Sequence, residues 1–245
     1  MIKQPYTSIL FIIFLLVNSY SFAKEPTVNI LAEALFPISY QDENSQEIKG
    51  IATDIIRSVM VEAKLDYTLE IYPWTRAYTS VTNIPNTLLY SVARIDKREE
   101  ELIWLQKIIT LDYGLYTPNK NLIDKPLDDI KNLYITVTEN GISHSTLVKH
   151  GFHNFIFIDD YARISQLIGR ERIEVIFTSS FWYKHNKNSF SKPLYKLKNI
   201  DLSTSDIELY FVLNKNSAPS IVSKLNRAFK IIIDNGKFDK IINSY

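Results

Sequence analysis

The chain contains no cysteine, and only 6 of its 245 residues are glycine. Without cysteine there are no disulfide bonds, so the fold must be stabilised by a hydrophobic core, which this length permits. Cysteine ligands for zinc are excluded for the same reason. The 15 tyrosines and 13 phenylalanines are not typical of a low-complexity or disordered chain.

Neither sign of charge predominates in the sequence. The 28 basic and 27 acidic side chains leave a formal net charge of +1, and no basic stripe stands out. Nucleic acid attracts proteins mainly through its phosphate charges, so the sequence gives no reason to expect a nucleic-acid partner.

The motifs of common enzyme classes are absent. There is no GxSxG, no GxGxxG, no P-loop and no HExxH, and no pair of carboxylates stands out from solvated surface. The four histidines do not share one helical face: His144, His150, His153 and His185. We therefore expect no metal ion, no cofactor and no catalytic residue.

The one long apolar run lies near the N-terminus. Lys3 precedes the nine apolar residues Ile9–Val17, and the small-x-small sequence Ser21-Phe22-Ala23 follows. This order predicts a signal peptide, residues 1–23, cleaved after Ala23. A run of nine is well short of the ~20 residues that span a bilayer, which argues against the alternative of a membrane anchor. We expect a soluble, monomeric protein of the bacterial periplasm.

Strand-like and helix-like segments alternate after residue 27. Residues 28–40 begin as a strand that breaks at Phe36-Pro37, and a polar turn ends at Gly50. Segments 67–74 and 86–93 also read as strands. Between them lie apolar residues at helical spacing: 51, 55, 56, 59, 60 and 63. This order predicts an α/β lobe with a largely parallel sheet.

A similar pattern restarts after residues 112–119. We predict strands at 133–137, 155–159, 173–179 and 208–215, and helices at 144–152 and 162–170. The tail has helical spacing at positions 221, 222, 225, 228, 229, 232 and 233, and stops at Asn235-Gly236 before a short last helix.

The whole pattern predicts two α/β lobes joined by two hinge crossings, near residues 112–119 and 206–215. The first lobe would comprise residues 24–113 and 212–245, and the second would comprise 114–211. Clefts between domains are preferred ligand sites.

Two arginines follow the predicted strand 86–93. In an α/β lobe ligands sit beyond the carboxyl ends of strands, where Arg94 and Arg98 lie. Each offers a planar fork of donors that fits a carboxylate. One such bond contributes about 1.5–3 kcal/mol, whereas micromolar binding needs about 8 kcal/mol, so one arginine orients a ligand without holding it alone. The alternative is pairing with nearby glutamates on the surface.

Aromatic and hydroxyl side chains give further candidates. If the extended stretch continues past Pro73, Trp74 and Arg76 point the same way, and the indole covers part of a ligand; the alternative for Trp74 is core packing. Ser143 lies at a predicted helix start, where free N–H groups attract anions, although an ordinary N-cap serine is the alternative. Ser179 or its neighbour Ser180 ends a strand that faces the cleft.

Three stretches resemble family 3 of the periplasmic solute-binding proteins, the type that serves polar amino-acid uptake. They are ILAEALFPISYQDENSQEIKGIATDII, SVARIDKREEELIW and LNRAFKIIIDNGKFDKIINSY, and the likeness covers nearly all of Val28–Tyr245. The resemblance implies a bilobal periplasmic-binding-protein-like fold, a small polar solute as ligand, and a membrane permease or sensor protein as partner.

The resemblance also assigns residues by position. Arg98 matches the arginine that grips an α-carboxylate, and Ser143 lies where the second lobe offers a hydroxyl and N–H groups. Tyr40 and Trp74 fall near the aromatic walls of the site. Ser91, which opens the second stretch, and Glu33, near the end of the first strand, complete the predicted ligand contacts.

Two departures from the family pattern bear on the ligand. Ser179 stands where the family has the aspartate that binds an α-amino group, and Ala52 stands where the first lobe has another aspartate. A free amino acid would leave its ammonium poorly paired, which is costly in a closed cleft. With Arg76 and Arg94 as added positive charge, we expect an anionic or polar ligand with an aromatic-covered portion.

Two other functions stay open. One is a sensor or accessory protein for a membrane receptor. The other is an enzyme, since some relatives of this fold resemble cyclohexadienyl dehydratases, and Glu33 is then the candidate acid or base.

Overall fold

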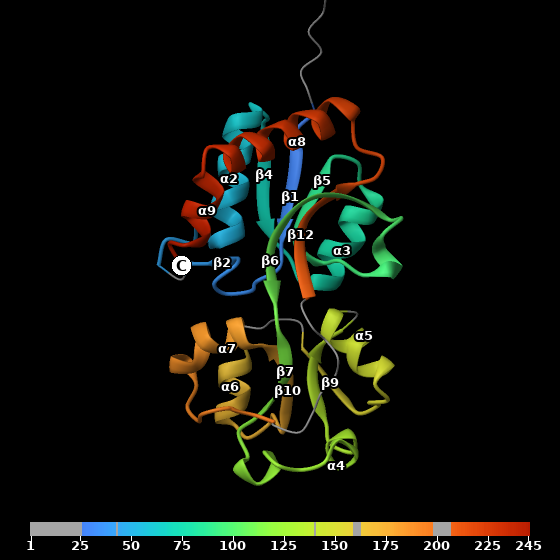
Figure 1. The fold of residues 1–245 in the computed structure, drawn as a ribbon, viewed down its shortest axis with the longest axis vertical. Coiled ribbons are helices and arrows are strands. Elements are labelled where there is room, and N and C mark those ends of the chain that lie inside the picture. The colour runs from blue at the N-terminus through green and yellow to red at the C-terminus, as the bar shows by residue number, and fades with distance from the viewer. Residues whose placement is uncertain (1–25, 43, 140, 159–162, 198–206) are drawn as a thin grey trace, which may run out of the picture.

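The computed structural model describes residues 26–245 except 43, 140, 159–162 and 198–206. The predicted signal peptide, residues 1–23, lies outside the described residues. The described chain forms two α/β lobes, each built on a five-stranded sheet and stacked along the long axis of the molecule (Figure 1). The predicted bilobal fold is confirmed.

The first lobe contains a mixed sheet with the strand order β4–β1–β5–β12–β6. The parallel strands are β1 (Val28–Ala32), β4 (Tyr67–Ile71) and β5 (Thr87–Ala93). Strand β12 (Ile207–Asn214) lies between β5 and β6 (Leu102–Leu111), antiparallel to both. Strand β12, the last strand of this sheet in the sequence, therefore lies inside the sheet and not at its edge.

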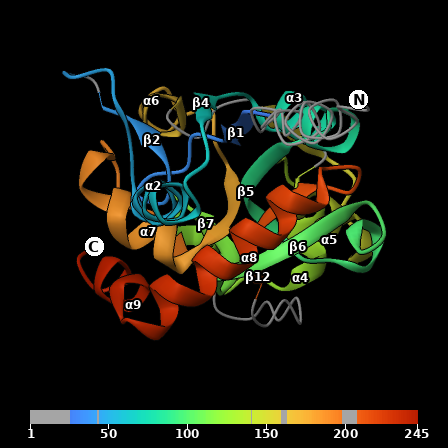
Figure 2. The ribbon, with the colours of Figure 1, turned by 90° about the horizontal axis from the view of Figure 1, so that it is seen from above.

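Helices cover both faces of this sheet. Figures 1 and 2 show α2 (Ile51–Ala63), α8 (Pro219–Asp234) and α9 (Lys237–Ile242) on one face and α3 (Trp74–Asn83) on the other. The predicted tail helices are confirmed, although Ile233 of the expected apolar stripe is exposed. No helix in the part of the chain that the structure describes is long and apolar enough to cross a bilayer.

The entry to α2 depends on one glycine. The short hairpin β2 (Tyr40–Gln41) and β3 (Ile48–Lys49) precedes Gly50, whose φ is +125°. A Cβ atom there would lie 2.5 Å from the backbone oxygen of Ile38, so only glycine fits without a shift. The polar turn predicted to end at Gly50 thus leads directly into the helix.

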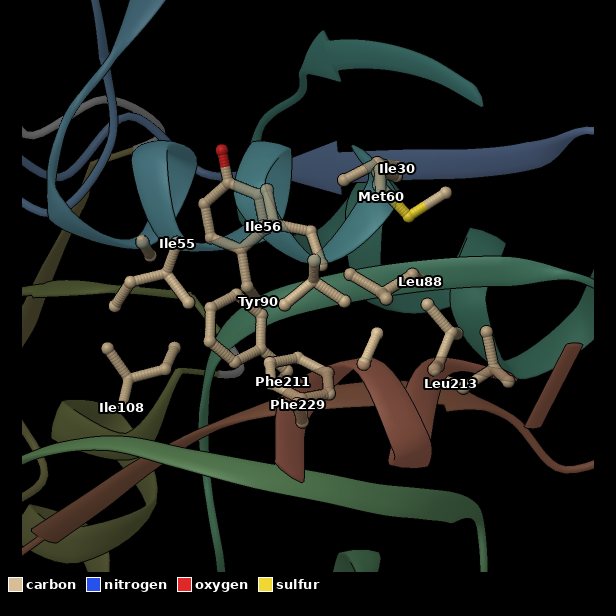
Figure 3. Packing of buried hydrophobic residues seen from close by; sticks show 14 of the residues in the cluster. Ile30, Ile55, Ile56, Met60, Leu88, Tyr90, Ile108, Phe211, Leu213 and Phe229 are labelled. Carbon is tan, nitrogen blue, oxygen red and sulfur yellow. The ribbon is translucent and has the colours of Figure 1, made fainter. Parts of the chain in front are cut away.

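The core of the first lobe lies between α2, α8 and the sheet. Every apolar position predicted for this helix is buried: Ile51, Ile55, Ile56, Val59, Met60 and Ala63. Figure 3 shows Tyr90 of β5 among these side chains, with its ring centroid 5.8 Å from that of Phe211. The Tyr90 hydroxyl is paired with the Thr53 hydroxyl at 2.8 Å, so its polar end is satisfied inside the core.

The second lobe is built in the same way. Its sheet has the order β11–β7–β10–β8–β9. The strands are β7 (Tyr113–Thr117), β8 (Ile135–Thr138), β9 (Phe155–Ile158), β10 (Val175–Ser179) and β11 (Tyr195–Lys196). The helices are α4 (Leu127–Lys131), α5 (Ile142–Lys149), α6 (Ile164–Gly169) and α7 (Ser180–Asn186). The second lobe also has the short 3₁₀ turns η2 (Lys120–Leu122) and η4 (Lys187–Ser189), whereas η1 (Asp96–Arg98) follows β5 in the first lobe.

The chain passes between the lobes at Asp112. Strand β6 ends at Leu111 and β7 begins at Tyr113, so this crossing is a single residue. Ser180 donates to Asp112 twice: its N–H to the Asp112 oxygen at 3.0 Å and its hydroxyl to the carboxylate. These bonds tie the crossing to the start of α7.

The return passage lies between β11 and β12, where residues 198–206 are outside the described part. Residues 207–211, which we assigned to the second lobe from the sequence, pair with β6 in the first sheet.

One local expectation is wrong, and one strand was not expected. The extended stretch does not continue past Pro73, because α3 begins at Trp74 and Ala77 donates its N–H to the Pro73 oxygen at 3.0 Å. Residues two apart on a helix face different directions, so Trp74 and Arg76 do not point the same way. The long strand β6 was not predicted at all.

Candidate functional site

A hollow lies between the two lobes, and we call it the interlobe pocket. Its empty space is about 440 Å³ when the part open to solvent is counted. Its wall combines Glu33, Leu35, Trp74, Ser91, Ala93, Arg98 and Leu209 of the first lobe with Tyr113, Thr138, Gly141, Ile142 and Ser143 of the second.

Arg98 is the cation of the interlobe pocket. The 3₁₀ turn η1 turns its side chain inward, and the residue is only 5% exposed. Its Nη1 donates to the Ala93 oxygen at 3.1 Å. Burial lowers the pKa of Arg98, and the Tyr78 side chain and the charge of Glu101 oppose that change. Arginine stays protonated in proteins, so a buried positive charge faces the hollow.

Two buried hydroxyls at the pocket wall have no hydrogen-bond partner in the described part of the chain. They are Ser91 Oγ in the first lobe and Thr138 Oγ1 in the second. Ser91 also has a φ of +66°, the left-handed region that serine rarely adopts. Leaving such groups unpaired is costly, so the wall is suited to a polar ligand that touches both lobes.

Ser143 reaches the pocket from the first turn of α5. It is buried, and the preceding N-cap position, Gly141, provides no side-chain cap. The first N–H groups of a helix lack partners within the helix and favour an anion. The N-terminal end of α5 and the Arg98 side chain of the opposite lobe therefore both favour an anion.

The interlobe pocket thus brings together five of the predicted contacts: Glu33, Trp74, Ser91, Arg98 and Ser143. Glu33 is the carboxylate among its wall residues, and its charge acts on Arg98.

Four other predicted residues lie outside this pocket. Arg94 is paired with Glu99 through two bonds of 2.8 and 3.1 Å, and Arg76 lies 3.8 Å over the Tyr72 ring. Tyr40 packs edge-on against Phe36 at 4.9 Å. Ser179 caps α7 by accepting from the Trp182 N–H at 3.0 Å. A contact between these four residues and a solute stays a prediction.

The sequence reasoning missed Thr138 and Tyr113. Thr138 follows the predicted strand 133–137 directly, so the rule that pointed to Arg98 applied to it as well. Tyr113 is at the pocket because it begins β7 immediately after the crossing, and nothing in its neighbourhood in the sequence signals this.

A second hollow, the outer pocket, adjoins the interlobe pocket. Trp74 and Arg98 line both, whereas Tyr78 and Glu101 of the first lobe line only the outer one. Lys97 and, from α5, His144 also line it. Among the described residues no group of three or more His, Asp or Glu side chains is arranged to hold a metal ion.

Two α/β lobes around a pocket with a buried guanidinium define the class of two-lobed binding proteins. This chain belongs to the bacterial extracellular solute-binding proteins, family 3, whose family model matches residues 28–245. The resemblance seen in the sequence is confirmed. No curated protein matches the chain.

Solved structures share the fold at low sequence identity. The arginine-, lysine-, histidine-binding protein ArtJ from Geobacillus stearothermophilus is 17% identical, with a TM-score of 0.73 over 90% of this chain and 95% of that one. A Salmonella typhimurium periplasmic binding protein with high arginine specificity is 14% identical, with a TM-score of 0.75 over 90% and 99%. A histidine kinase sensor domain is 11% identical, with a TM-score of 0.76 over 91% and 96%.

Proposed function

We propose that this chain is a periplasmic solute-binding protein that captures a small polar solute bearing a carboxylate and presents it to a membrane permease. The observation that carries the proposal is the interlobe pocket, where the buried Arg98 faces the uncapped start of α5. Both groups favour an anion, and they come from different lobes.

The solute carboxylate lies between Arg98 and the first turn of α5 in this proposal. Arg98 supplies a charge-assisted bond from the first lobe, and the Ser143 hydroxyl and the α5 N–H groups supply bonds from the second. The hydroxyls of Ser91 and Thr138 pair with further polar atoms of the solute. Because these donors come from both lobes, bound solute favours the closed arrangement.

The ligand we favour is not a standard α-amino acid. Ser179, which replaces the family's aspartate, is committed to capping α7, and Ala52 is buried inside α2. Neither position offers a carboxylate to an α-ammonium group. Glu33 is the acidic side chain at the wall, and its charge already acts on Arg98.

Native purification tests the proposal. Protein purified without refolding and then denatured should release a carboxylate-bearing solute, identified by mass spectrometry. Arg98→Met should weaken binding of that solute about 10- to 100-fold, the effect of one charge-assisted bond. Arg94→Met, which removes an arginine outside the pocket, is the matched control. The proposal is contradicted if the protein releases no solute and binds none that is added. It is also contradicted if Arg98→Met and Arg94→Met bind the solute with equal affinity.

Export is a separate part of the proposal. The predicted signal peptide is cleaved after Ala23, so N-terminal sequencing of protein from the periplasm should begin at Lys24. A chain that retains residues 1–23 contradicts this part alone.

A sensor or accessory role is the second candidate. It is favoured by the fold shared with a histidine kinase sensor domain and by Ser179 in place of the aspartate. Crosslinking in cells separates the two, because a permease partner supports transport and a receptor partner supports sensing.

We propose that the chain is not an enzyme. An enzyme of the cyclohexadienyl dehydratase type would use Glu33 as acid or base, and turnover of prephenate or arogenate would establish it.

A further inference from the structure

Arg98 forms part of the wall between two hollows. Its side chain and that of Trp74 line both the interlobe pocket and the outer pocket. Tyr78 and Glu101 line the outer pocket and are absent from the wall of the inner one. They therefore lie behind the guanidinium as seen from the proposed solute position.

The guanidinium rests on two aromatic rings. Trp74 and Tyr78 are four residues apart on α3, and their ring centroids are 5.4 Å apart with 30° between the planes. The Cζ atom of Arg98 lies 4.8 Å from the Trp74 centroid and 4.9 Å from the Tyr78 centroid. Both distances allow a cation–π interaction, which is strongest where water is excluded.

Tyr78 is held in turn by Glu101. The Tyr78 hydroxyl donates to Glu101 Oε2, and the Glu101 N–H donates to the Arg98 oxygen at 3.2 Å. Burial and the bond to Glu101 raise the pKa of Tyr78, so its hydroxyl keeps the proton that it donates. The carboxylate also places a negative charge near a cation that has lost most of its hydration.

We infer that Tyr78 and Glu101 are positioning residues that fix the direction of the Arg98 guanidinium toward the interlobe pocket without touching the solute. Tyr78 fixes one face of the guanidinium, and Glu101 fixes Tyr78 while balancing the buried charge. The importance of this arrangement for binding rests on the proposed function, but the restraint on Arg98 does not.

The restraint is tested first, by NMR of the arginine side chains in the ¹⁵N-labelled protein without ligand. Arg98→Lys identifies the Arg98 signals by their loss. In the wild type the Nη signals of Arg98 should be resolved, because rotation of a held guanidinium is slow. Tyr78→Phe and Glu101→Gln should merge or broaden them.

Tyr72→Phe is the matched control. Tyr72 is half-buried and carries a similar set of contacts, since its hydroxyl donates to Glu70 at 2.8 Å in an exposed bond and its ring lies under Arg76. This variant should leave the Arg98 signals unchanged. Circular dichroism checks folding, and Glu101→Gln decides the question if Tyr78→Phe does not fold. Averaged Nη signals in the wild type, or unchanged signals in both variants, overturn the inference.

Calorimetric titration with succinate and glutarate as carboxylate probes then tests the consequence for binding. For a probe that binds the wild type, Tyr78→Phe and Glu101→Gln should each raise Kd about tenfold, and Tyr72→Phe should not change it. Unchanged Kd in both variants overturns the role in binding. If neither probe binds the wild type, the result counts against a carboxylate ligand, and the NMR experiment still decides whether Arg98 is positioned as inferred.

Discussion

Arg94 and Arg98 are four residues apart and have different environments. The side chain of Arg94 is 41% exposed and forms a two-bond ion pair with Glu99, while its Cζ lies 5.3 Å from the Trp104 ring. Arg98 is buried at the interlobe pocket. The Arg94 guanidinium is thus paired with a surface glutamate, whereas the Arg98 guanidinium faces the space between the lobes.

Replacing Arg94 should therefore have little effect on binding. We expect Arg94→Gln to leave the affinity for the natively bound solute unchanged, because its partner Glu99 lies outside the pocket. The stability change should be close to the error of urea denaturation, since exposed ion pairs contribute little and are screened by salt. A loss of affinity comparable to that of Arg98→Met would show that Arg94 reaches the solute.

Ser91 combines an unusual backbone conformation with an unpaired hydroxyl. Its φ is +66°, where glycine is much less strained than any residue with a Cβ atom. We expect Ser91→Gly to be about 1 kcal/mol more stable than Ser91→Ala, as measured by urea denaturation. Both variants remove the hydroxyl, so both should bind the solute more weakly than the wild type. Equal stability of the two variants would mean that the left-handed conformation carries no strain.

A loop of the first lobe and a helix of the second meet beside the interlobe pocket. Leu35 packs against core residues of both lobes. On α7, Phe181 packs against the first-lobe core, and Asn186 donates its side-chain N–H to the Phe36 oxygen at 3.3 Å. These contacts stabilise closure of the lobes independently of the donors proposed for the solute.

Shortening Leu35 should shift the lobes toward an open arrangement. Leu35→Ala removes apolar contacts on both sides, and we expect the ratio of open to closed molecules to rise about tenfold. Small-angle X-ray scattering without ligand should then give a larger radius of gyration. Val61→Ala, on the exposed side of α2, is the control and should not change it. An unchanged radius in both variants would show that Leu35 does not hold the lobes together.

Some elements were predictable because their signals are local. The apolar spacing from Ile51 to Ala63 predicts α2, and the Asn235-Gly236 stop predicts the end of α8. The start of α3 was not predicted, because segment 67–74 alternates like a strand until Pro73. Strand β6 was missed because its residues alternate poorly and its burial depends on pairing with β12, about a hundred residues later.

The site was predictable in part for the same reason. The rule for strand ends pointed to Arg98, and the predicted helix start pointed to Ser143. The rule does not separate Arg98 from Arg94, because the direction of each side chain is set by the turn η1. The position of Tyr113 at the same pocket as Arg98 depends on how the lobes meet, and no short stretch of sequence encodes that.

The whole protein should lose stability in alkali. Burial raises the pKa of Tyr116 to about 12, and it also raises the pKa of Tyr78 and Tyr90. Unfolded tyrosine has a pKa of about 10. A raised folded pKa means that the stabilisation is complete below pH of about 10 and is lost as the pH rises through the folded value.

The urea midpoint of unfolding, measured from pH 8 to 12, should therefore decrease once the pH exceeds about 10. Absorbance of tyrosinate should appear as the protein unfolds. Tyr90→Phe removes one of these buried hydroxyls and should make the fall with pH shallower. A constant midpoint across this range would contradict the prediction.

The position of β12 has a consequence for biosynthesis. The second sheet is built from a nearly continuous stretch, so it can assemble before the C-terminal residues arrive. The first sheet cannot, because β5 and β6 become neighbours of the same strand only when residues 207–214 arrive. Until then the earlier half of the protein exposes two unpaired strand edges to chaperones and proteases, and a nascent chain cut short before β12 leaves it unfinished.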